Sequence, residues 1–155
     1  MSFDAAARNR VHDWLFGQAL PLWATAGIDD QDRFFEKLDF NGRPVTGVPR
    51  RTRVQARQTY VFIQAAALGW TDAKPVARAA LDALIRNNRR DDGLWVRATD
   101  DAGVVIDATP DLYDLAFVLF ALAAAHRVLK DEQAQPLALE TLAAIQTQMA
   151  DPVHG

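Results

Sequence analysis

Four arginines within eight residues form the densest group of side chains that could hold a ligand: Arg50, Arg51, Arg53 and Arg57. They occupy the start of an expected helix, where each exposed cation opposes the helix dipole at a cost of about 0.3–1 kcal/mol. Together with free helix N–H groups they could bind an anionic or hydroxyl-rich ligand. The simpler interpretation, which we favour for Arg50 and Arg51, is that they are solvated and pair with surface acids.

Arg53 and Arg57 differ from the other two because they are four positions apart and share one helix face. Arg57 also lies just before residues 59–68, a stretch without any charge. An arginine that enters an apolar helix needs a partner or a cavity. Both residues are therefore candidates for a binding pocket, and a structural role for them stays open.

Tyr113 and Asp114 hold the equivalent place in a later expected helix. The tyrosine could present its hydroxyl group to a central pocket, or it could be a core aromatic residue whose hydroxyl is satisfied. Asp114 could pair with an arginine of the earlier helix. Of the four tryptophans, Trp95 at the start of an expected hairpin is the best candidate for stacking on a sugar ring, although packing is the commoner role.

The composition excludes several kinds of site. No cysteine is present and the only serine is Ser2, which rules out disulfides, thiolate chemistry and a Ser-His-Asp triad. The three histidines, His12, His126 and His154, show no metal-ligand spacing, and no glycine-rich phosphate loop occurs. We therefore expect no metal and no cofactor.

Charge and hydropathy indicate the surroundings in which the chain works. Lysine and arginine number 17 against 20 aspartate and glutamate residues, a net charge of -3 that does not favour nucleic-acid or membrane-surface binding. The first ten residues lack an apolar signal segment, and the longest uncharged apolar run, residues 115–125, is shorter than the roughly 20 residues that span a bilayer. These features predict a soluble cytoplasmic protein.

The sequence patterns predict helices joined by short hairpins. The five expected helices cover residues 4–26, 49–68, 71–88, 109–129 and 131–149. Two intervening stretches, 34–45 and 94–106, each place β-prone runs around a glycine-containing turn, as in a β-hairpin. The second and fourth helices contain long stretches without charge and are expected to be buried all round, whereas the others are amphipathic.

The order of hairpin, buried helix and amphipathic helix occurs twice along the chain. Gly42 and Gly103 are 61 positions apart, and residues 60–67 resemble residues 117–125. A period near 60, made of one inner and one outer helix, favours an α/α array or toroid. An ordinary helical bundle with two similar hairpins is the alternative.

Four segments in this order resemble the N-terminal part of the N-acylglucosamine 2-epimerase family. They are ALPLW at residues 19–23, FFEKLDFNG at 34–42, RVQARQTY at 53–60 and DLYDLAF at 111–117. The family includes aldose–ketose isomerases of mannose-type sugars and cellobiose 2-epimerase. The resemblance implies an all-α fold, an (α/α)6 barrel with a sugar pocket at its mouth, to which the residues matching Arg57 and Tyr113 contribute.

The resemblance also implies a reaction: aldose–ketose isomerisation or 2-epimerisation of a mannose- or glucosamine-type sugar, free or phosphorylated, by proton transfer through an enediol. In the family the acid–base groups are histidines on later helices, and none of the histidines here matches them. We therefore expect no catalytic residue within this chain. Arg57, Tyr113, Arg53 and Trp95 are the candidate substrate-binding residues, and the arginine cluster slightly favours a sugar phosphate.

The length of the chain indicates that it holds only part of such a barrel. Residues 1–155 look like a single N-terminal part of an incomplete barrel with short β-hairpins between helix pairs. A broken array exposes the apolar face that the next repeat covers, so we expect self-association or contact with the missing C-terminal portion. Two alternatives to a sugar isomerase stay open: a non-catalytic helical-repeat interaction module, and a sugar-binding module without turnover.

Overall fold

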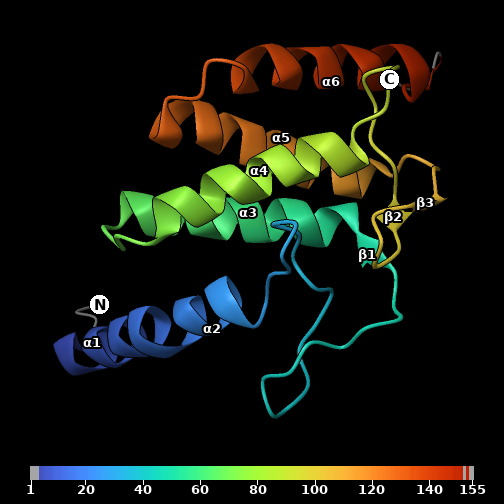
Figure 1. Ribbon diagram of the computed structural model, residues 1–155. Coiled ribbons are helices and arrows are strands. Elements are labelled where there is room, and N and C mark those ends of the chain that lie inside the picture. The colour runs from blue at the N-terminus through green and yellow to red at the C-terminus, as the bar shows by residue number, and fades with distance from the viewer. Residues whose placement is uncertain (1–3, 152, 154–155) are drawn as a thin grey trace.

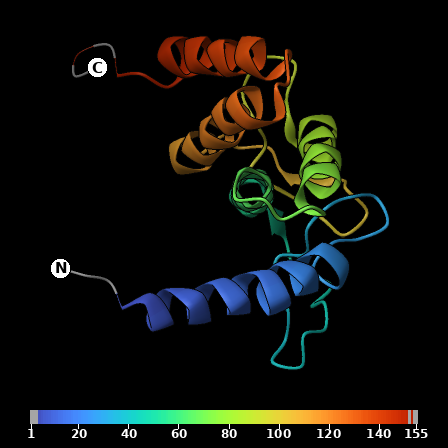
Figure 2. The same cartoon turned by 90° about the vertical axis from the view of Figure 1, so that its left-hand side faces the viewer.

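The computed structural model describes residues 4–151 and residue 153, and most of these residues are helical. The helical elements are α1 Ala5–Trp14, η1 Leu15–Ala19, α2 Leu20–Thr25, α3 Thr52–Ala67, α4 Ala73–Asn88, α5 Leu112–Ala124, η2 Ala125–Leu129 and α6 Ala134–Gln148, of which η1 and η2 are π-helical turns. Figure 1 shows α3 to α6 stacked on one another, with α1 and α2 along the lower edge. Viewed from the side, α3 lies near the centre between the N-terminal helix and the other helices (Figure 2).

The expected first helix is present, and its proline does not end it. The turn η1 joins α1 to α2, and Pro21 lies in the first turn of α2. Proline has no N–H group to donate, and its ring crowds the carbonyl group one turn earlier. A π-helical turn is wider than an α-helical one, so η1 accommodates both effects without a break.

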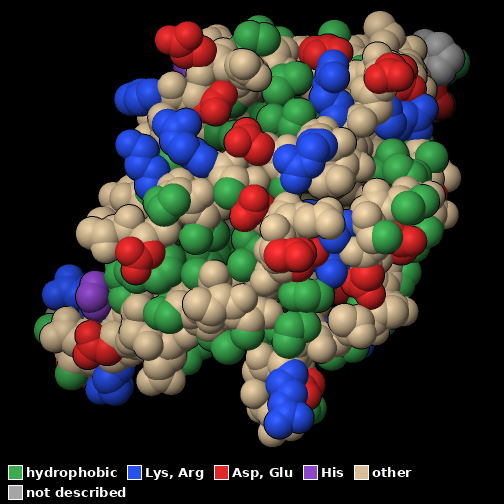
Figure 3. Space-filling view, viewed as in Figure 1, with side chains coloured by type: hydrophobic (Ala, Val, Ile, Leu, Met, Phe, Trp, Pro, Cys, Tyr) green, Lys and Arg blue, Asp and Glu red, His purple; other side chains and the backbone are tan. Residues whose placement is uncertain are grey.

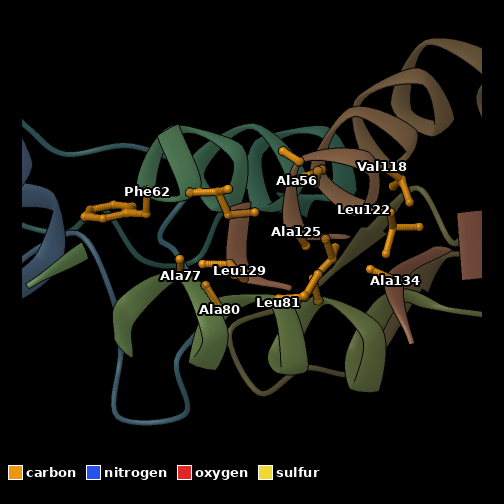
Figure 4. Close-up of a cluster of buried hydrophobic side chains, with 14 of the residues drawn as sticks. Ala56, Phe62, Ala77, Ala80, Leu81, Val118, Leu122, Ala125, Leu129 and Ala134 are labelled. Carbon is orange, nitrogen blue, oxygen red and sulfur yellow. The ribbon is translucent and has the colours of Figure 1, made fainter. Parts of the chain in front are cut away.

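The core lies between α3, α4 and α5 and extends to α6. Helix α3 packs on α4 and α5, and α5 also packs on α6. Figure 4 shows buried side chains that three helices contribute to this core, among them Phe62 of α3, Leu81 of α4 and Leu122 of α5, none of them more than 1% exposed. By length and composition alone, Leu112–Leu129 could span a bilayer, but here this stretch is a packing partner of α3 and α6.

One expectation from the sequence is wrong, because α3 and α5 are not buried all round. Val61 on α3 is 41% exposed, and Phe120 on α5 is 60% exposed. Both side chains lie on a face of the two helices that neither α4 nor α6 covers. An apolar helix surface left open in this way is typical of a site that packs against something further.

Short strands join the helix pairs. Strands β1 Arg50–Arg51, β2 Ala98–Thr99 and β3 Val105–Asp107 form an antiparallel sheet in the order β1-β2-β3. The turn between β2 and β3 contains Gly103 at φ 85°, and a Cβ atom there would lie 2.6 Å from Nη1 of Arg33. Only glycine fits this conformation and this close approach. In the earlier expected hairpin the structure has a single antiparallel bridge, between Leu38 and Pro44.

Two buried arginines and two aspartates tie the loops together; we call Asp29, Arg33, Arg50 and Asp101 the ion-pair cluster. The Arg50 guanidinium donates to Oδ2 of Asp29 at 2.7 Å and to Oδ1 of Asp101 at 2.9 Å. Nη2 of Arg33 lies 2.9 Å from the same Asp29 oxygen and donates to the carbonyl oxygen of Asp101 at 2.7 Å. Arg50 pairs with acids as expected, but the prediction that it is solvated is wrong because it is only 3% exposed.

We expect acid to destabilise the fold through this cluster. Burial raises the pKa of Asp29, but hydrogen bonds from the Arg33 backbone and the Arg50 side chain outweigh it, so the pKa falls below its ordinary value. Hydrogen bonds from the Gly47 backbone and then from Arg50 lower the pKa of Asp101. A carboxyl group with a lowered folded-state pKa stabilises the fold above its unfolded pKa of about 3.9 and loses this effect as the pH falls through the folded value.

Urea unfolding between pH 6 and pH 2 measures this effect. The free energy of unfolding should start to fall near pH 4, and it should fall less steeply in Asp29→Asn, which cannot titrate at this position. An identical acid dependence in the variant and the wild type would show that the cluster is not responsible.

Candidate functional site

Two adjoining cavities lie beside the uncovered face of α3 and α5. The first, of about 550 Å³, is bounded by α2, by residues 36–42 and by α3. The second, of about 320 Å³, lies between α3 and α5. Arg57 and Val61 line both cavities, so the two spaces meet at Arg57.

Arg57 is an exposed cation placed on an aromatic wall. Its guanidinium carbon lies 5.0 Å from the centroid of the Phe117 ring on α5. It forms no hydrogen bond or ion pair with any residue that the structure describes. The planar face of the guanidinium is therefore supported by a ring, while its N–H donors point to no protein partner. A group held in this way can bind carbonyl or hydroxyl oxygens of a ligand.

Tyr113 lies at the start of α5, one helical turn before Phe117. The residue is 56% exposed, and its ring contacts Phe117 edge to face, with 5.1 Å between the ring centroids. Asp111 fixes this end of the helix, because its side chain accepts hydrogen bonds from the backbone N–H groups of Tyr113 and Asp114. The hydroxyl group of Tyr113 forms no hydrogen bond within residues 4–151 and 153.

The expected pairing of Asp114 with an arginine of the earlier helix is confirmed. Nη1 of Arg53 donates to Oδ1 of Asp114 at 3.1 Å. Burial raises the pKa of Asp114, and the Arg53 charge opposes this shift. The guanidinium of Arg53 also lies 5.8 Å from the centroid of the Tyr113 ring. The structure thus brings Arg53, Arg57 and Tyr113 to one face of the α3–α5 pair.

The other arginines of the cluster are not free to bind a phosphate group. Arg51 forms an ion pair with Glu36, and Arg50 is bonded to two aspartates of the ion-pair cluster. Arg53 is paired with Asp114, so three of the four arginines already form ion pairs with carboxylates. The sequence expectation that this cluster favours a sugar phosphate is therefore not supported by the geometry.

Trp95 lies apart from the other candidates. It is 1% exposed, and its Nε1 donates to Oγ1 of Thr141 on α6 at 3.0 Å. A ring that is closed off by protein on all sides cannot stack on a sugar. Trp95 is therefore a core residue in this structure, which is the packing role that the sequence left open.

Neither histidine in the described part of the chain contributes to these cavities. His12 stacks on Phe16, and the ring of His126 lies 3.3 Å from the carbonyl oxygen of Asp131; neither residue lines the two cavities. His154 lies outside the described residues. Within residues 4–151 and 153, no three His, Cys, Asp or Glu side chains are grouped to hold a metal ion.

Sequence reasoning missed the aromatic residues of the wall. The sequence predicts Phe117 and Phe120 to be buried helix residues, yet with Tyr60 they line the second cavity. The signal was present, because the contacts Arg57–Phe117 and Tyr60–Phe120 join residues 60 positions apart, which matches the period seen in the sequence. The sequence predicted a hairpin at residues 34–45 but not that residues 36–42 bound the first cavity, since the position of a loop depends on contacts distant in sequence.

Comparison with known proteins places the chain in a family. The family model of N-acylglucosamine 2-epimerase matches residues 34–155. The chain is 38% identical over 124 residues to mannose-6-phosphate isomerase of Rhizobium meliloti (strain 1021), covering 79% of this chain and 32% of that protein. It is 32% identical over 123 residues to D-mannose isomerase of Thermobifida fusca, covering 77% and 30% respectively. The chain thus spans about a third of the length of these relatives.

Solved structures agree on the fold. Cellobiose 2-epimerase from Spirochaeta thermophila DSM 6192 superposes with a TM-score of 0.87 at 24% identity, over 97% of this chain and 38% of that one. A D-mannose isomerase superposes with a TM-score of 0.83 at 20% identity, over the same shares of the two chains. With the family match covering most of its residues, the chain belongs to the N-acylglucosamine 2-epimerase family.

Proposed function

We propose that this chain forms part of the pocket of a sugar isomerase or epimerase that acts on mannose- or glucosamine-type sugars, free or phosphorylated. The observation that carries the proposal is Arg57, a cation that pairs with no described residue and lies on an aromatic wall where two cavities meet. Aromatic rings and an oriented guanidinium suit a ligand that has both C–H faces and oxygen atoms. The names of the relatives support the same class of substrate.

The chemistry of this class assigns a role to each proposed residue. Isomerisation removes a proton from the carbon next to the sugar carbonyl, and negative charge develops on the carbonyl oxygen in the enediol-like intermediate. Arg57 binds that oxygen and stabilises the charge. Tyr113 positions the sugar ring, and Arg53 supports the ring of Tyr113. The acid–base groups that move the proton belong to neither His12 nor His126, because neither lines the pocket.

We propose further that residues 1–155 form the N-terminal part of an (α/α)6 barrel, with α3 and α5 as two of its inner helices and short hairpins between helix pairs. The uncovered face of α3 and α5 supports this placement, since it would line the barrel interior. The coverage supports it too, because the chain matches 38% of the cellobiose 2-epimerase chain at a TM-score of 0.87. We expect such a protein to be soluble and cytoplasmic.

Thermal unfolding in the presence of sugars tests the function. D-mannose, D-fructose or their 6-phosphates should raise the melting temperature, because a ligand that binds only the folded chain stabilises it by RT ln(1 + [L]/Kd). For a chain of this size each kcal/mol corresponds to about 2–4 °C. Stabilisation without turnover of D-mannose is the expected result, because we expect no catalytic residue within this chain. If none of these sugars shifts the transition, the proposed pocket is wrong.

Self-association through the open apolar surfaces is a separate expectation. Phe120 on α5 is 60% exposed, and Leu139 and Leu142 on α6 are 60% and 43% exposed. Hydrophobic side chains also reach the surface between the N-terminal helix and the stacked helices (Figure 3). Light scattering over a dilution series should show a dimer that dissociates, and Phe120→Glu should shift the equilibrium toward monomer. A wild-type chain that stays monomeric at all concentrations would contradict this expectation.

A further inference from the structure

Asp114 is a buried carboxylate for which the proposed chemistry has no direct use. The residue is 1% exposed. Its Oδ1 accepts a hydrogen bond from Arg53, while its Oδ2 has no hydrogen-bond partner in the described part of the chain. Burying a carboxylate oxygen without a partner is unfavourable. Packing alone therefore gives no reason for an aspartate at this position, where an apolar side chain would avoid the cost.

A continuous series of contacts leads from Asp114 to the pocket. Asp114 holds Arg53 across the α3–α5 interface. The Arg53 guanidinium lies against the Tyr113 ring, and that ring packs on Phe117. Phe117 in turn supports Arg57. Each contact orients the next, so the placement of Arg57 depends on where Arg53 is held.

We propose that Asp114 is a positioning residue: by holding Arg53 against the Tyr113 ring, it fixes the aromatic wall on which Arg57 lies. Without Asp114, the guanidinium of Arg53 loses its only carboxylate partner among the described residues and swings toward solvent, and the Tyr113 ring loses the cation beside it. The effect of this positioning on sugar affinity rests on the proposed function. The positioning itself does not, because it can be observed at the ring.

Proton NMR of the tyrosine rings tests the positioning directly. The chain has two tyrosines, and Tyr60 packs on Phe120, which contacts Phe117, instead of on Arg53. The nearly isosteric Asp114→Asn should move the Tyr113 ring signals strongly and those of Tyr60 less. Arg53→Gln should give the same shift, and the double variant should add nothing to it, because both changes break one interaction.

A second ion pair between helices provides the matched control. Nη2 of Arg89 donates to Oε1 of Glu140 at 2.6 Å, joining the end of α4 to α6. Glu140→Gln breaks this pair and should leave the Tyr113 ring signals unchanged. A shift in this control as large as in Asp114→Asn would mean that the signals report general loosening, and it would overturn the proposal.

A pH profile separates positioning from simple packing. The groups facing Asp114 are Arg53 of α3, Asp111 at the start of α5, and Arg97 beside β2. Burial, with the Asp111 charge, raises the pKa of Asp114 against the two arginines. As the pH falls through this raised pKa, the neutral carboxyl group releases Arg53, so the wild-type Tyr113 signals should move toward those of Asp114→Asn. The variant should show no such titration.

Binding of D-mannose gives the functional readout. Asp114→Asn should bind D-mannose about tenfold more weakly than the wild type, the size expected when a charge-assisted contact no longer orients the wall. If the wild type binds no sugar, the proposed function fails while the Tyr113 signals still decide the role of Asp114. If the sugar binds but neither the ring signals nor the affinity responds to Asp114→Asn, the positioning role is overturned and the pocket stands.

Discussion

Replacing Arg57 with alanine is expected to weaken sugar binding strongly while leaving the fold intact. The side chain is exposed and its one described contact is with the Phe117 ring, so its loss should cost only about 0.5–1 kcal/mol of stability. In the pocket, by contrast, the guanidinium provides charged hydrogen bonds worth about 1.5–3 kcal/mol each. We therefore expect the dissociation constant for D-mannose, measured by calorimetric or NMR titration, to rise by a factor of ten to several hundred.

Two further variants make this experiment specific. Arg57→Lys keeps the charge but loses the planar group that rests on the ring, so its affinity should lie between those of wild type and alanine. Arg10→Ala removes an exposed arginine of α1 and should change nothing. Equal affinity of wild type and Arg57→Ala would place the sugar elsewhere on the molecule.

Of the substitutions considered, Asp29→Ala should cause the largest decrease in the free energy of unfolding. Its Oδ2 faces both Arg33 and Arg50 at 2.9 and 2.7 Å, and the side chains of these arginines are only 6% and 3% exposed. Without Asp29, the one carboxylate left in the cluster is that of Asp101, which Arg50 bonds, whereas Arg33 keeps a hydrogen bond only to the carbonyl oxygen of Asp101. Breaking a buried pair by removing one partner costs about 3–5 kcal/mol. Urea unfolding at neutral pH measures this as a lower transition midpoint.

Glu140→Ala is the matched control for this prediction. It removes an acid from a pair whose side chains are 30% and 45% exposed, so the expected loss is below about 1 kcal/mol. A loss in Asp29→Ala no larger than in Glu140→Ala would show that the buried arginines are adequately compensated by other groups.

Local patterns predicted the helices, because the residues that define a helix lie within a few positions of one another. The repeat in the sequence also indicated one contact between two helices. The uncharged stretches of α3 and α5 marked the helices that meet in the core, and the period near 60 reappears as the offset between Arg57 and Phe117. Charge logic indicated that Asp114 could pair with an arginine of the earlier helix, and the structure shows that this arginine is Arg53.

Features that depend on distant segments could not be predicted in this way. The burial of Arg50 depends on Asp29 and Asp101, which are 21 and 51 positions away. The burial of Trp95 depends on Thr141, 46 positions away on α6. Hydrophobicity alone also could not show which face of α5 stays open, because that depends on which neighbours are present to cover it.

The central claim is that the uncovered face of α3 and α5, with Arg57 at its centre, binds a sugar. Chemical-shift mapping by NMR during a D-mannose titration tests it most directly, and the chain of 17.2 kDa is small enough for residue assignments. We predict saturable shifts at Arg57, Tyr113 and Phe117 and none along α4 or α6. Shifts that do not saturate, or that are confined to α4 and α6, would contradict the account.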